Sequence, residues 1–97
     1  MSYINGCFVN AHGTKCACNR SPIEVRREEN RLLLQIEGSG HGSVTMHGNC
    51  GNGIFRTLEG KTFDLTVEFD TSRQRWTISL RRNQNFVAEG EILDMPP

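Results

Sequence analysis

The sequence lacks a long hydrophobic run and an excess of charge of either sign. No window approaches the roughly 20 apolar residues of a membrane-spanning helix. The N-terminal stretch MSYINGCFVNAHG has neither the basic start nor the apolar run of a secretory signal. Eleven basic residues balance eleven acidic ones, so no overall field attracts nucleic acid or an anionic membrane. These absences predict a cytoplasmic protein that binds neither nucleic acid nor a membrane.

The chain contains four cysteines. Inside the cell, four cysteines in a short chain are typical of free thiols or metal ligands. In a secreted protein they are typical of two disulfides. The role of the cysteines and the compartment therefore depend on each other, and the sequence leaves both alternatives open.

The length of the chain, 97 residues, is that of one domain, because so short a chain has no apolar area for a second core. We expect a single β domain over residues 1–97. Residues 1–21 show no clear hydrophobic period, and we expect an irregular, cysteine-containing segment that packs on this domain.

The C-terminal half shows the period of β-strands. In residues 62–69, TFDLTVEF, apolar and polar residues alternate, which predicts a strand with one buried face. The same alternation in WTISL predicts a hairpin partner with Trp76 on the buried face. A third strand is expected over residues 86–93, where Gly90 indicates a bulge or a close backbone contact.

Two interpretations compete for residues 23–37. Alternate residues Leu32, Leu34 and Ile36 favour a second pair of strands. The glutamates and arginines, with Ser21 and Pro22 as an N-cap and a first-turn proline, favour a helix. We prefer the strands, because the three apolar residues fit a period of two better than a helical stripe.

Six of the ten glycines lie in residues 38–53. Glycine is typical of turns, so we expect two loops around a short strand, SVTMH. Together these elements predict an all-β fold, a small antiparallel β-barrel or β-sandwich of five to seven short strands with a glycine-rich loop region.

Soft ligands suggest one metal site. Cys16, Cys18, His47 and Cys50 form a Cys3His set of the kind that binds zinc in a tetrahedron. Residues that could substitute for one member of this set are Cys7, His12 and His41. The alternative is that the cysteines are free thiols or form disulfides.

No catalytic motif is complete. None of the cysteines has a local nucleophile signature. The segment EGKT at residues 59–62 contains the Gly-Lys-Thr of a phosphate-binding loop, but Phe55 stands where the first glycine belongs and a strand follows. We therefore expect a protein that is not an enzyme.

Two arginines carry a resemblance to a known family. RREENR places Arg27 and Arg31 four residues apart just before a strand, and NCGNGIF and GKTFDLTVEF follow. Over residues 26–92 this order resembles that of PilZ domains, β-barrels that bind cyclic di-GMP. The resemblance implies that Arg27 and Arg31 clamp the phosphates and guanine faces, and that Asn49 starts a second motif, Asp/Asn-x-Ser-x-x-Gly. Gly51 replaces the serine of that motif, and Gly53 arrives one residue early.

These observations lead to one functional hypothesis and two alternatives. The main hypothesis is a small, non-catalytic binding module of the inhibitor, immunity or adaptor type. It recognises a partner protein or a small ligand through glycine-rich loops or a strand edge. The first alternative is a PilZ-like receptor for cyclic di-GMP that uses Arg27 and Arg31. The second is a zinc-stabilised or metal-binding protein.

Overall fold

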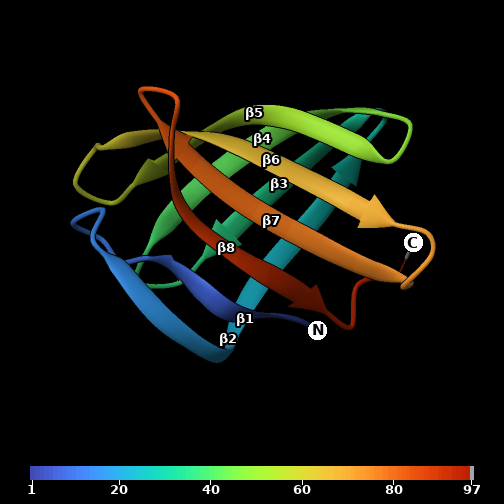
Figure 1. Ribbon diagram of the computed structural model, residues 1–97, viewed down its shortest axis with the longest axis horizontal. Helices are drawn as coiled ribbons and strands as arrows, with labels where there is room; N and C mark the ends of the chain where they lie inside the picture. Colours follow the sequence, from blue (N-terminus) through green and yellow to red (C-terminus); the bar gives the residue numbers. More distant parts are fainter. Residues whose placement is uncertain (97) are drawn as a thin grey trace.

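The computed structural model describes residues 1–96 and shows eight antiparallel strands closed into a barrel in sequence order (Figure 1). The strands are β1 (Ser2–Val9), β2 (Lys15–Glu28), β3 (Arg31–Ile36), β4 (Gly40–His47), β5 (Cys50–Thr57), β6 (Thr62–Asp70), β7 (Arg75–Arg82) and β8 (Asn85–Leu93). Pairing of β1 with β8 closes the barrel. The all-β antiparallel fold is confirmed as a barrel, whereas the expected count of five to seven strands is too low.

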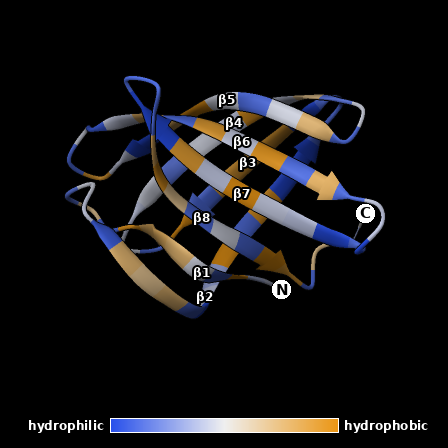
Figure 2. Cartoon of the chain, in the orientation of Figure 1, coloured by the Kyte–Doolittle hydropathy of each residue, from blue (hydrophilic) through white to orange (hydrophobic). Residues whose placement is uncertain are grey.

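Alternation along the strands separates the interior of the barrel from its surface (Figure 2). The predicted hairpin of residues 62–80 is confirmed as β6 and β7, and Trp76 is only 5% exposed. Residues 23–37 form the end of β2 and β3, so the preference for strands over a helix is confirmed. At Gly90 the backbone of β8 lies against β1 at Gly6, which confirms the expected close contact.

Two expectations about local structure are wrong. Residues 1–21 are not irregular: they form β1 and the first part of β2, with a bulge between Ile4 and Gly6. The glycine-rich stretch is not a pair of loops, because four of its six glycines lie inside β4 and β5. These are Gly40, Gly42, Gly51 and Gly53. They share a strand face with Val44 and Phe55, and at Gly42 and Gly51 an added Cβ would meet core side chains.

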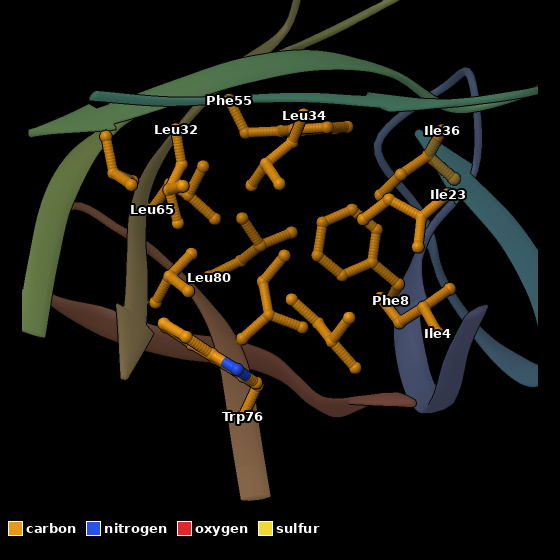
Figure 3. Packing of buried hydrophobic residues seen from close by; sticks show 14 of the residues in the cluster. Ile4, Phe8, Ile23, Leu32, Leu34, Ile36, Phe55, Leu65, Trp76 and Leu80 are labelled. Carbon is orange, nitrogen blue, oxygen red and sulfur yellow. The ribbon is translucent and has the colours of Figure 1, made fainter. Parts of the chain in front are cut away.

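The interior of the barrel is filled by side chains. Phe8 from β1 and Phe55 from β5 meet in a T-shaped contact with ring centroids 4.9 Å apart, and both are fully buried (Figure 3). Eight strands enclose a space just wide enough for such side chains. A ligand therefore has to bind at an end of the barrel or on its outer surface.

The two ends of the barrel differ in their connections. One rim holds the β1–β2, β3–β4, β5–β6 and β7–β8 turns, of which the first, third and fourth lie on the left in Figure 1. The opposite rim, which we call the mouth, holds the β2–β3, β4–β5 and β6–β7 turns. Backbone hydrogen bonds tie two of these three turns to neighbouring strands, from Met46 N–H to the Asn30 carbonyl (2.6 Å) and from Phe69 N–H to the Asn49 carbonyl (2.8 Å). The mouth is thus braced by its own backbone.

Candidate functional site

A hollow of about 250 Å³ lies at the mouth, and we call it the rim basin. Its lining is Arg27, Glu29, Arg31, Leu32, Met46, Gly48, Asn49, Phe69, Thr71 and Trp76. Apolar side chains contribute from β3, β4, β6 and β7, and polar ones from the three turns and the adjacent strand ends. The three residues predicted as ligand contacts, Arg27, Arg31 and Asn49, all belong to this lining.

Arg27 reaches the basin because it occupies the last inward position of β2, following Ile23 and Val25 in the alternation. At the barrel end such a position opens to solvent, which lets a charged side chain occupy it. Its guanidinium donates a hydrogen bond of 2.7 Å to the Pro96 carbonyl. The same group lies over the Trp76 ring, 5.6 Å from the centroid, in the geometry of a cation–π contact.

Arg31 opens β3 and donates a hydrogen bond of 3.2 Å to the Ser43 hydroxyl. Within residues 1–96 neither Arg27 nor Arg31 forms an ion pair, whereas their neighbour Arg26 pairs with Glu28 at 3.1 Å. Glu29 is the single carboxylate in the lining. The basin therefore carries a positive charge that the described chain does not neutralise.

Trp76 forms one wall of the basin and packs against Phe69, with ring centroids 5.0 Å apart. It lies at the margin of the hydrophobic cluster, away from Phe8 and Ile4 (Figure 3). Its indole Nε1 is buried and has no hydrogen-bond partner among residues 1–96. The sequence predicted Trp76 as a core residue. Alternation along β7 predicts that the ring faces the interior of the barrel. It does not predict that this end of β7 lies at the mouth.

The four predicted metal ligands do not come together. Cys16 and Cys18 lie on β2 near the β1–β2 turn, whereas His47 and Cys50 flank the β4–β5 turn at the mouth, on the opposite rim. Across residues 1–96, no group of three or more His, Cys, Asp or Glu side chains is placed to hold a metal ion. The predicted Cys3His site is thus not assembled within the described chain.

The three proposed substitutes for these ligands lie in three different places. The Nδ1 atom of His12 contacts the Glu59 carboxylate, which joins the β1–β2 and β5–β6 turns. His41 lies on the outer face of β4, where it pairs across the sheet with Arg56. Cys7 lies on β1, in register with Ala17 between the two cysteines of β2.

Burial raises the pKa of the Cys18 thiol, and the nearby thiols of Cys16 and Cys7 raise it further, while a hydrogen bond with Ser21 lowers it in part. A higher pKa leaves less of the reactive thiolate at a given pH. We expect iodoacetamide in mildly alkaline buffer to alkylate Cys18 more slowly than Cys50, which is also half-buried. Peptide mass spectrometry over time measures both rates. Equal rates would contradict the raised pKa.

The sequence suggests two binding features, glycine-rich loops and a free strand edge, and the structure shows where each of these segments lies. The glycine-rich segments lie mainly in strands, and the closed order pairs every strand with two neighbours over at least part of its length. In the described registers, the tip of the β1–β2 hairpin extends past this pairing: residues 7–9 of β1 pair only with residues 15–17 of β2.

No helix in residues 1–96 is long and apolar enough to cross a membrane.

Fold and site together define a small, closed, eight-stranded antiparallel barrel with a cationic basin at its mouth. Comparison with known protein families, curated proteins and solved structures gives no match. The resemblance to PilZ domains therefore depends on the arginine spacing and the segments that follow it.

Proposed function

We propose that the protein is a small, non-catalytic binding module whose rim basin takes a small organic anion. The observation that carries the proposal is that one hollow combines a guanidinium without an ion pair and apolar walls. Arg27 forms no ion pair within residues 1–96, and the lining also contains Leu32, Met46, Phe69 and Trp76. A ligand with an anionic group and an apolar body satisfies both features.

The charge of the basin selects an anion. Arg27 uses one guanidinium donor on the Pro96 carbonyl, and its other donors are available to a carboxylate, sulfonate or phosphate. The Arg31 guanidinium donates to the Ser43 hydroxyl on the outer face of the sheet, so Arg31 adds its positive charge at the edge of the basin. Arginine suits these groups because its planar fork can bind two oxygens at once. Glu29 offsets one of the two positive charges of the arginines, so the lining keeps a net positive charge.

The body of the ligand is apolar and small. Leu32, Met46 and Phe69 supply an apolar surface beside Trp76, and methionine adapts its shape to different partners. The volume of about 250 Å³ is below the range of about 300–1,000 Å³ that is usual for drug-sized ligands. The basin therefore holds one ring system or the end of a larger molecule that projects into solvent.

An aromatic sulfonate, 1-anilinonaphthalene-8-sulfonate, tests the proposal because it combines an anion with fused rings. Trp76 is the only tryptophan, so quenching of its emission and energy transfer to the bound dye report directly on the basin. We expect saturable binding with one site. Calorimetry should show at least about a tenfold loss of affinity in Arg27→Ala, because hydrogen bonds to charged groups contribute about 1.5–3 kcal/mol.

Two further variants sharpen this test. Trp76→Phe replaces the indole wall of the basin with a smaller ring, so it should weaken binding of the dye. It should also lower the stability of the empty protein, because Trp76 is only 5% exposed. Arg81→Ala, on the outer face of β7, is the matched control and should bind as the unchanged protein does. Absence of saturable binding up to about 1 mM, or equal affinity in Arg27→Ala and Arg81→Ala, would overturn the proposal.

Cyclic di-GMP is a second candidate ligand, because Arg27 and Arg31 line one basin together with Asn49, which lies 18 residues after Arg31 in the sequence. In this case the two arginines hold phosphates and guanine faces, and most of the dinucleotide lies outside the hollow. Calorimetry with cyclic di-GMP tests it: heat that disappears in Arg27→Ala and Arg31→Ala supports the candidate. Absence of heat at high micromolar ligand removes it and leaves the smaller anion.

A further inference from the structure

A second hollow lies on the outer surface of the barrel, over β2 to β5, and we call it the outer groove. Its volume is about 460 Å³, and its lining is Glu24, Arg26, Leu33, Leu34, Gln35, His41, Gly42, Ser43, Ile54 and Arg56. The strand register explains its form. In one row across the sheet Arg26 pairs with Leu33, Leu33 with Ser43 and Ser43 with Ile54. In the adjacent row Glu24, Gln35, His41 and Arg56 are paired in the same way.

The groove therefore runs along the strands. Its floor comes from β3 and β4, where the outward side chain of Ser43 is short and accepts a hydrogen bond from Arg31. Its walls are the longer side chains of β2 on one side and of β5 on the other. The closed strand order keeps the backbone of β3 and β4 in the sheet, so a partner in this groove is recognised through side chains and not by addition of a strand.

The floor and one wall carry an apolar strip. Ile54 is 52% exposed although it lies in the middle of β5. Leu33 is half-buried and separated from Ile54 by Ser43 alone. On β6, by contrast, the outward positions carry Thr62, Asp64, Thr66 and Glu68. Ile54 and Leu33 thus give the groove a small apolar surface between its polar side chains.

Arginines stand on both walls of this strip. Arg56 forms no ion pair within residues 1–96. Arg26 pairs with Glu28, but both side chains are more than half exposed, and such surface pairs contribute little to stability. Arg26 can therefore exchange Glu28 for a carboxylate of a partner. Glu24 is the single carboxylate of the lining.

We infer that the outer groove is a docking site for an extended, acidic segment of a partner protein, with an apolar side chain between carboxylates. The apolar side chain packs on Leu33 and Ile54, and the flanking carboxylates face Arg26 and Arg56. An open groove buries one side of its occupant, whereas a small-molecule pocket buries most of the ligand surface. A chain segment, which gains affinity by extending along the groove, is thus the occupant that the shape favours.

A fluorescein-labelled peptide with one leucine flanked on both sides by glutamates tests this inference, and the same peptide with lysines is the control. We expect saturable anisotropy with the acidic peptide only. In two-dimensional amide spectra the shifts should concentrate at Leu33, Ser43 and Ile54. Arg56→Glu and Ile54→Ser should each weaken binding about tenfold or more, an effect of about 1.4 kcal/mol.

Arg81→Glu makes the same charge change on the outer face of β7 and should leave the affinity unchanged. Arg27→Ala should also leave it unchanged, which separates the outer groove from the rim basin. Equal binding of the lysine peptide, shifts outside the groove, or unchanged affinity in Arg56→Glu would overturn the inference. So would free glutamate binding as tightly as the peptide, since this result indicates a small-molecule site.

Discussion

Phe55→Ala is expected to lower the free energy of unfolding by about 3–5 kcal/mol, the usual cost of removing a buried aromatic ring. Phe55 is fully buried and meets Phe8 edge to face. The two rings come from β5 and β1 and belong to the buried cluster that fills the interior of the barrel. For a domain of this size, about 4–8 °C in melting temperature is lost per kcal/mol. Urea unfolding followed by Trp76 fluorescence measures the loss.

The matched control is Phe86→Ala, since Phe86 is 52% exposed and lies at the start of β8. It removes the same ring from a position where little apolar area is buried, and we expect a loss below about 1 kcal/mol. Similar losses in the two variants would show that Phe55 and Phe8 are not the centre of the core.

Gly53→Ala is expected to cost more than about 3 kcal/mol, beyond the usual range of about 1–3 kcal/mol for overpacking. An added Cβ would collide with the main-chain carbonyl of Ser43 and lie 2.9 Å from the Val44 Cα. Backbone atoms of a paired strand cannot rotate away as a side chain can, so β4 and β5 would have to separate. Thermal unfolding and the amide signals of Ser43 and Val44 measure the effect.

Gly48→Ala is the control for this substitution. Gly48 lies in the β4–β5 turn with open space around its Cβ position but with φ +64°. Gly48→Ala should lower the free energy of unfolding by about 1–2 kcal/mol, because alanine is strained in the left-handed conformation. If Gly53→Ala proves no more destabilising than Gly48→Ala, the close approach of β4 and β5 at Gly53 is wrong.

Alternation predicted the strands whose two faces differ in polarity. In β6 and β7 each buried residue is apolar and alternates with polar ones, so periodicity alone finds the hairpin. In β1 the bulge before Gly6 shifts the register, and the segment shows no period. In β4 and β5 inward positions hold glycine, because the strand faces there meet other main-chain and core atoms closely. Composition indicates loops for such segments, and only the tertiary packing shows why they are strands.

Three residues that the sequence suggests as ligand contacts line the rim basin. Arg27 and Arg31 were selected by their spacing before a strand, and Asn49 by a partial motif. All three lie at the mouth because turns on one rim of an up-and-down barrel are brought together by its closure. The sequence gives no indication of which strand ends share a rim. For this reason Trp76 was missed as a site residue, and Cys16 and Cys18 were grouped with His47 and Cys50 across the length of the barrel.

The filled interior of the barrel also has a kinetic consequence. Because Phe8, Phe55 and their neighbours leave no lumen, a ligand of the rim basin has no portal to pass and no lid to wait for. Association should then be set by diffusion and by the electrostatic attraction of the arginines, and should slow as salt is added. The residence time of the ligand should depend on contacts at the mouth and not on transient opening of the strands. Core variants that stay folded should therefore release the ligand at an unchanged rate.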